Sequence, residues 1–157
     1  MRKRLAILVA LVLVFAIPQP HVVAQHDASQ DRADIEQVFN KYKQSLDTAD
    51  VALASQVWLQ SPEVLVVTPS GRFTGWNGVK DIYANMQKQF SEQHVQASNV
   101  SIVVAGDAAW LVYDFVFTAT LANGQPLTTK GWESHGYLRT PDGWRIAHLH
   151  YSLIPNS

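Results

Sequence analysis

Residues 108–151 read AAWLVYDFVFTATLANGQPLTTKGWESHGYLRTPDGWRIAHLHY and predict three long strands joined by two turns. β-Branched and aromatic residues dominate the strands, and turn-forming residues separate them. Asn123-Gly124 is a pair typical of a tight hairpin, and Pro141-Asp142-Gly143 forms the second turn. The strands are expected at residues 108–121, 127–140 and 144–151. The C-terminal half is therefore expected to be an antiparallel sheet.

Helical patterns come before this sheet. From Asp31, apolar residues recur at every third or fourth position and predict a helix with one apolar face. Asp31 or Asp34 is expected to cap its start. The residues of that face are Ile35, Val38, Phe39, Tyr42 and Leu46. Asp50 is expected to cap a second, short helix that ends before Pro62. A third helix is expected to begin in the segment 75–78 and to end within residues 89–93.

Shorter strand patterns complete the chain. Residues 64–68 and 72–74 surround a Pro-Ser-Gly turn, and residues 94–105 predict another long strand. Helices followed by hairpins are the order of an α+β domain. The sequence contains no internal repeat and no linker, so we expect one domain over residues 31–153, preceded by a disordered polar segment at residues 25–30.

The first 24 residues have the three parts of a secretory signal peptide. Three basic residues at positions 2–4 precede an apolar run of 13 residues, Leu5–Ile17. Val22-Val23-Ala24 supplies the small residues of a cleavage site after Ala24. Because a helix needs about 20 apolar residues to span a bilayer, we expect cleavage rather than a stable membrane anchor. The mature protein is then exported, to the periplasm or the medium.

Composition excludes several classes of function. The chain has no cysteine, so it has neither a disulfide nor a cysteine nucleophile. Cleavage after Ala24 removes three of the 12 basic residues and leaves nine against 13 acidic ones, a net charge near −4. Without a basic stripe, nucleic-acid binding is not expected. The sequence has no Gly-x-Ser-x-Gly motif and no phosphate-binding loop, and we expect no cofactor.

The combined pattern resembles the SnoaL-like and ketosteroid-isomerase-like members of the nuclear transport factor 2-like superfamily. The resemblance depends on VLVVTPSG at residues 64–71, GWNG at residues 75–78 and the closing DGWRIAHLHYS at residues 142–152. Residues 109–151 also resemble the association domain of calcium/calmodulin-dependent protein kinase type II. The resemblance implies a cone-shaped α+β fold, in which three N-terminal helices pack on a curved antiparallel sheet.

Alternation along the strands divides the sheet residues between two faces. The resemblance implies that the concave face, together with the helices, lines a pocket and that the convex face forms a homodimer. The expected pocket residues are Tyr42, Trp58, Met86, Phe115, Phe117, Glu133, His135, Leu149 and Tyr151. The expected residues of the dimer face are Trp110, Trp132, Ile146, His148 and His150.

Aromatic walls with a few polar groups are typical of a small-molecule site. In the kinase association domain, pocket arginines occupy the positions of Phe115, His135 and Tyr151, so a strongly anionic ligand is not favoured here. We expect a small, largely apolar ligand, with His135 as its polar contact. The alternative is that these side chains simply fill the core. A third class of function is a self-assembly module like the kinase domain.

The resemblance also makes an isomerase-like or dehydratase-like reaction a candidate function. The carboxylate base of the superfamily's steroid isomerases falls on Thr68, while their tyrosine donor falls on Tyr42 and their second donor near His135. Threonine cannot take up a proton near neutral pH, so the base is missing. Glu133 and His135, two residues apart on one strand, could replace it as a proton-transfer pair. The alternative is two polar residues with ordinary hydrogen bonds.

A metal site is the remaining hypothesis. His148 and His150 are an i, i+2 pair that projects to one side of a strand, and Asp114 is the nearby third candidate ligand. Relatives with this fold do not build metal sites at these positions, and a dimer interface also accounts for the residues. We therefore expect no metal, and we favour small-molecule binding without established catalysis.

Overall fold

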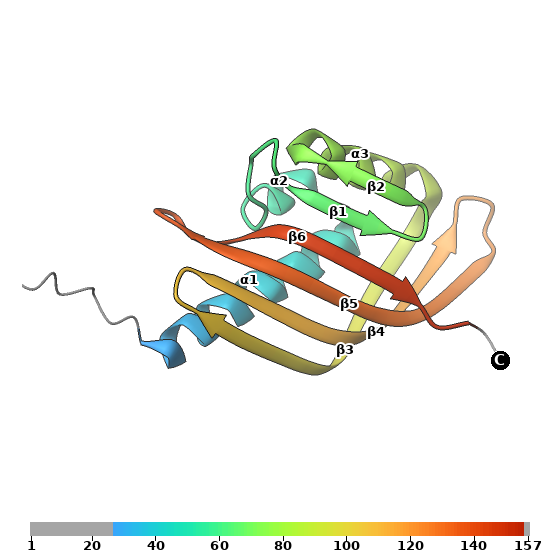
Figure 1. Cartoon of the computed structure of the whole chain (residues 1–157). Helices are drawn as coiled ribbons and strands as arrows, with labels where there is room; N and C mark the ends of the chain where they lie inside the picture. Colours follow the sequence, from blue (N-terminus) through green and yellow to red (C-terminus); the bar gives the residue numbers. More distant parts are fainter. Residues whose placement is uncertain (1–26, 156–157) are drawn as a thin grey trace, which may run out of the picture.

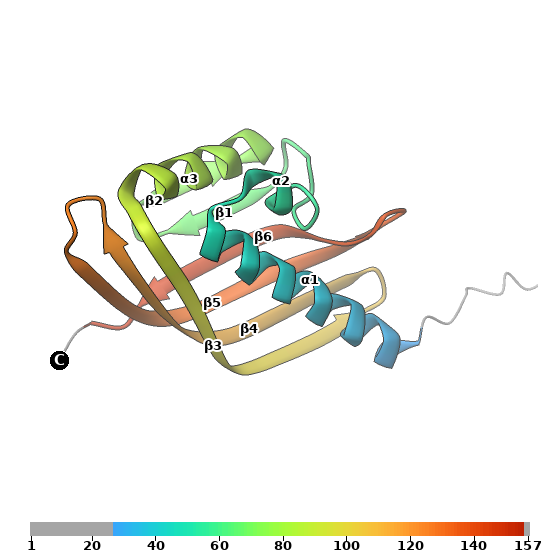
Figure 2. The same cartoon turned by 180° about the vertical axis from the view of Figure 1, so that it is seen from behind.

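The computed structural model describes residues 27–155, in which a curved six-stranded sheet carries the helices on its concave side (Figures 1 and 2). The elements are α1 (Ala28–Thr48), α2 (Val51–Ala54), β1 (Leu65–Thr68), β2 (Gly71–Thr74), α3 (Gly75–Gln89), β3 (Phe90–Ala105), β4 (Ala108–Leu121), β5 (Pro126–Thr140) and β6 (Gly143–Leu153). The predicted α+β class is confirmed. The predicted signal peptide and its cleavage site lie outside the described residues. None of the described helices is both long enough and apolar enough to cross a membrane.

The strand order is β2-β1-β6-β5-β4-β3. Strands β3 to β6 are joined by antiparallel hairpins, as their turn signals predict. The expectation of an entirely antiparallel sheet is wrong at one place, because β1 lies parallel to β6, with Val66 opposite Leu149. This pair joins segments about 80 residues apart, and no local sequence signal specifies its direction.

Helix α1 begins earlier than predicted. Asp27 caps it, and its side chain accepts a hydrogen bond of 2.9 Å from the backbone N–H of Ser29. Residues 28–30 therefore form the first turn, and the expectation that they are disordered is wrong. Asp31 lies buried inside the helix rather than at its cap, and it pairs with Arg139 of β5 at 2.6 Å. This ion pair attaches the start of α1 to the sheet.

Helix α2 is shorter than expected. Asp50 caps it as predicted, and its side chain accepts hydrogen bonds from the backbone N–H groups of Ala52 at 2.7 Å and Leu53 at 3.0 Å. The helix ends at Ala54, well before Pro62, and the chain then turns so that Trp58 bridges Ile146 of β6. The Trp58 side chain is thereby brought beside the inner face of the sheet.

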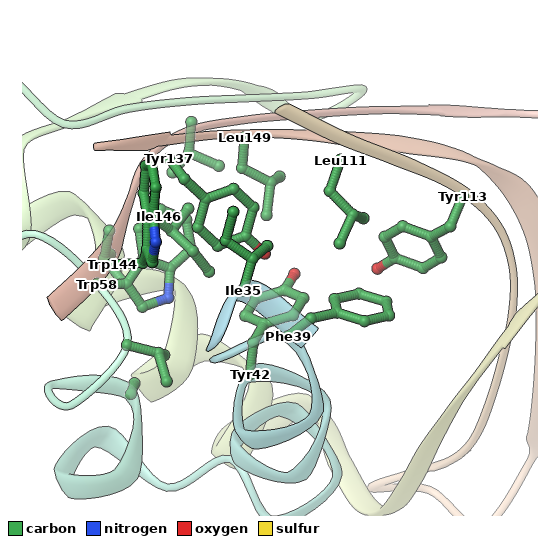
Figure 3. Packing of buried hydrophobic residues seen from close by; sticks show 14 of the residues in the cluster. Ile35, Phe39, Tyr42, Trp58, Leu111, Tyr113, Tyr137, Trp144, Ile146 and Leu149 are labelled. Carbon is green, nitrogen blue, oxygen red and sulfur yellow. The ribbon is translucent and has the colours of Figure 1, made fainter. Parts of the chain in front are cut away.

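The core lies between α1 and the concave face of the sheet. Ile35, Phe39 and Tyr42 of α1 are almost fully buried, as their spacing predicts. Figure 3 shows these side chains turned toward Leu111 and Tyr113 of β4. Burial of this contiguous apolar cluster is the main source of stability in a domain without disulfides.

A β-bulge in β6 corrects one prediction about the two faces. Tyr137 of β5 pairs with Ile146, whereas Gly136 pairs with His148, so Ala147 is an extra residue in β6. An extra residue reverses the alternation of side chains on either side of it. Ile146 is therefore on the inner face and fully buried, and it does not belong to the predicted dimer face.

Candidate functional site

A cavity of about 330 Å³ lies between the concave face of the sheet, α1 and α3. Its inner wall is formed by the buried side chains of Tyr42, Trp58, Val66, Val79, Tyr83, Val95, Tyr113, Phe115, Glu133 and Leu149. Exposed polar residues at its mouth are Ser70, Asn85 and Gln89. The cavity has a size near the lower end of ligand pockets, which is about 300 Å³.

Eight of the nine predicted pocket residues line this cavity. They are Tyr42, Trp58, Met86, Phe115, Phe117, Glu133, Leu149 and Tyr151. The exception is His135, which does not line the cavity and is 1% exposed. Glu133 is the charged side chain of the inner wall, and the prediction that His135 lines the pocket is wrong.

His135 belongs to the core behind Glu133. Its imidazole lies among four aromatic rings, with ring centroids 4.7 to 5.9 Å away. These rings are those of Phe39, Tyr42, Tyr113 and Tyr137. Strand alternation places His135 on the same face as Glu133, but α1 covers this part of the sheet and leaves no space beside the imidazole.

Glu133 is the centre of a buried hydrogen-bond network. Its Oε1 atom accepts hydrogen bonds from the Tyr42 hydroxyl at 2.8 Å and the Tyr113 hydroxyl at 2.6 Å. His135 Nε2 lies 2.6 Å from the same oxygen. The Oε2 atom takes part in none of these bonds. These partners compensate Oε1 for part of the loss of water. Oε2 is left for a molecule that reaches Glu133 from the cavity, which this residue lines.

Three elements bring the network together. Glu133 and His135 are two residues apart on β5, which directs both side chains to one face. Tyr113 lies directly opposite Glu133 on β4. Tyr42 reaches the same carboxylate from α1 because it belongs to the apolar face that the helix turns toward the sheet.

The tyrosines of the inner wall are held as proton donors. Burial raises the pKa of the Tyr42 and Tyr113 hydroxyls well above its usual value, and the negative charge of Glu133 raises it further. Burial also raises the pKa of Tyr83 to about 12, and the Tyr83 hydroxyl lies 2.6 Å from Ser45 Oγ. These hydroxyls therefore stay protonated at neutral pH.

The family of the chain follows from comparison. A sequence model of the SnoaL-like domain matches residues 27–150, which include almost all of the described fold. The chain belongs to the SnoaL-like domain family. A comparison with curated protein sequences gives no match.

Solved structures agree with this assignment of the SnoaL-like domain. A nuclear transport factor 2-like superfamily protein from Salmonella enterica subsp. enterica serovar Typhimurium str. LT2 is 34% identical, with a TM-score of 0.80 over 83% of this chain and 96% of that one. The hexachlorocyclohexane dehydrochlorinase LinA-type3 from Novosphingobium barchaimii LL02 is 15% identical, with a TM-score of 0.72 over 82% and 90%. The second likeness is one of fold alone.

Sequence reasoning missed part of the site in this SnoaL-like domain. Tyr113 is not among the predicted pocket residues, although its position opposite Glu133 follows from the hairpin register. Tyr83 and Val79 of α3 also line the cavity. Helical spacing alone shows only that such residues share a face of the helix, and it does not show which space that face borders.

The histidines of β6 do not form part of a metal cluster. Within residues 27–155, no group of three or more histidine, cysteine, aspartate or glutamate side chains is arranged to hold a metal ion. Asp114, the candidate third ligand, instead accepts a hydrogen bond of 2.5 Å from the side chain of Asn99. Thr68, at the position of the steroid-isomerase base, lies along the cavity as an uncharged residue.

Proposed function

We propose that this SnoaL-like domain binds a small, largely apolar molecule in the cavity, with Glu133 in place of His135 as the polar contact. The observation that supports the proposal is a space of about 330 Å³ whose aromatic and aliphatic walls meet one buried carboxylate. Convergence of a few polar groups in an apolar pocket is the usual form of a small-molecule site.

The alternative of a filled core is harder to reconcile with this space. Protein interiors are packed as densely as organic crystals, with few voids larger than a water molecule. An unused space of this size forgoes the contacts that its lining could make, which costs stability. A ligand that fits between Trp58, Phe115 and Tyr151 would recover those contacts.

Isothermal titration with small aromatic alcohols such as benzyl alcohol tests this function. Met86 of α3 lines the cavity and is only partly buried, so Met86→Trp should fill the space without disturbing the core. We expect binding in the wild type and in the control Met86→Leu, and at least tenfold weaker binding in Met86→Trp. Equal binding in all three proteins would place the ligand elsewhere.

Proton transfer is a second candidate function, an isomerase or lyase reaction with Glu133 as the base. It is favoured because Glu133 lines the cavity while its Oε1 atom is held by three partners, and Oε2 takes part in none of those bonds. His135 would then be a positioning residue, because it touches Glu133 but not the cavity. The hexachlorocyclohexane dehydrochlorinase has the same fold, and its name indicates that it catalyses an elimination. Incubating candidate ketones in D₂O, with Glu133→Gln as the control, would detect deuterium exchange at carbon.

We also propose that the convex face pairs with a second copy of the chain. Trp110 and Trp132 are 49% and 51% exposed. Val103 on β3 and Val112 on β4 are also exposed. The sheet register places Trp110 beside Val103. An apolar patch of this kind is typical of an interface, and a twofold dimer is the simplest arrangement that covers it.

A further inference from the structure

We infer that the cavity selects a small organic cation, a protonated amine or quaternary ammonium group on an apolar body, with Glu133 as its counter-ion. The inference depends on the proposed ligand-binding function and narrows it to one class of ligand. Three features of the described residues carry it: the arrangement of hydrogens around Glu133, the absence of a basic partner in the cavity wall, and the aromatic rings of that wall.

The hydrogens around Glu133 indicate an ionised carboxylate beside a neutral imidazole. The Tyr137 hydroxyl lies 2.9 Å from His135 Nδ1, so its hydrogen has an acceptor when that nitrogen is unprotonated. The ring hydrogen is then on Nε2 and is donated to Glu133 Oε1. Tyr42 and Tyr113 donate to the same oxygen. Three donors on one oxygen stabilise a carboxylate rather than a neutral acid.

This arrangement gives the network one net negative charge. A protonated His135 would cancel it, but its Nδ1–H would then point at the Tyr137 oxygen and leave the Tyr137 hydrogen without the acceptor it has now. Tyr137 is 1% exposed, so water is not at hand to replace that acceptor. Burying a hydroxyl hydrogen without a partner is costly.

The cavity wall contains no cation to balance the charge. Glu133 is the single charged side chain among the described residues that line it. In the described part of the chain, the arginine ion pairs join Arg139 to Asp31 and Asp107, away from the cavity. A buried carboxylate is costly unless a positive group pairs with it. A cationic ligand that contacts Oε2 would supply this partner.

The aromatic rings of the wall favour the same class of ligand. Phe115 and Tyr151 meet nearly at right angles, with ring centroids 5.8 Å apart and an interplanar angle of 87°. Tyr42 and Trp58 form a second corner, at 6.1 Å and 69°. All four rings line the cavity, and aromatic rings attract ammonium groups that lie over their faces, most strongly where water is excluded.

Two matched pairs of probes test the inference by isothermal titration of the full chain at pH 7. Phenethylamine is compared with 2-phenylethanol, and cyclohexylamine with cyclohexanol; the members of each pair differ mainly in charge. We expect each amine to bind at least tenfold tighter than its alcohol. Glu133→Gln, which keeps the size of the side chain, should abolish this preference while alcohol affinity changes by less than about threefold. Glu36→Gln, on the exposed surface of α1, is the matched control and should keep the preference.

The outcomes separate the inference from the function on which it depends. Equal binding of amines and alcohols by the wild type would overturn the cation inference and leave ligand binding intact. Binding of neither would overturn both, and a preference that survives in Glu133→Gln would show that Glu133 is not the counter-ion. If Glu133→Gln does not fold, the two amine–alcohol comparisons with the wild type decide, and equal affinity within both pairs would overturn the inference.

Discussion

Tyr113 and Glu133 lie directly opposite each other on β4 and β5, and the Tyr113 hydroxyl donates a hydrogen bond of 2.6 Å to Glu133 Oε1. Tyr113→Phe removes this donor and nothing else. Because the carboxylate is buried, we expect the free energy of unfolding to fall by about 1–3 kcal/mol. Urea denaturation measures the change. Tyr151→Phe, at a half-buried position, should lose less of the free energy of unfolding. Unchanged stability in Tyr113→Phe would contradict the hydrogen-bond network.

His135→Ala should destabilise the fold far more than a change at the edge of the pocket would. It removes a ring packed among four aromatic side chains and leaves the Tyr137 hydroxyl without its acceptor. We expect a loss of about 2–5 kcal/mol, from the space left in the core together with the orphaned groups. Thermal denaturation should show a fall of several degrees or more. A melting temperature within one degree of the wild type would support the sequence prediction that His135 faces the pocket.

The part of the cavity wall that the strands supply could be predicted in part, because alternation is a local property of a strand. The predicted and observed bounds of β4 are the same, and both Phe115 and Phe117 line the cavity as expected. The sequence could not show, however, which residues of the concave face border the cavity and which lie under a helix. Glu133 borders the cavity and His135 lies under α1, although both point to the same side. Which of them meets open space depends on where a helix 90 residues earlier in the chain crosses the sheet.

The bulge at Ala147 shows a second limit. Residues 145–151 alternate without a glycine or proline that would signal a break. The break arises from tertiary pairing: Ile146 is held by Tyr137 on one side and by the bridge to Trp58 on the other. These contacts draw Ile146 into the core, and the strand accommodates them with one extra residue. Alternation then holds again from His148 onward.

Export is predicted from the basic start, the apolar run and the small residues before position 25. Mass spectrometry of the protein recovered from the cells that produce it should give an N-terminus at Gln25, cyclised or not. The cleaved form should be found in the periplasm or the medium. A protein that keeps Met1 as its main form inside the cell would contradict the prediction.

Dimerisation through the convex face predicts that Trp132→Glu separates the subunits. A carboxylate in an apolar interface loses water without gaining a partner, which is unfavourable in a dimer and harmless on an exposed monomer surface. Sedimentation at tens of micromolar should show a dimer for the wild type and a monomer for Trp132→Glu. Gln37→Glu introduces the same charge on the exposed side of α1 and should remain dimeric. A wild-type monomer at this concentration would contradict the proposed interface.

Alkaline pH should destabilise the domain through its tyrosines. Burial raises the pKa of Tyr83 from its ordinary 10.0 to about 12. Above pH 10 the unfolded chain loses this proton while the folded chain keeps it, so proton release favours unfolding. The stabilisation is fully present below pH 10 and is lost as the pH rises toward 12. A two-unit shift corresponds to a loss on the order of 3 kcal/mol.

Urea denaturation between pH 8 and 11.5 measures this loss, with Tyr83→Phe as the test variant. Phenylalanine has no proton to release, so the slope of unfolding free energy against pH above 10 should become shallower by up to about 1.4 kcal/mol per pH unit. Below pH 10 the variant should show only a constant loss, from the missing contact with Ser45. Lysine deprotonation contributes to both proteins alike and cancels in the comparison. Parallel slopes for the two proteins above pH 10 would mean that the Tyr83 hydroxyl titrates in the folded state as it does in water, and that it is not buried between α1 and α3.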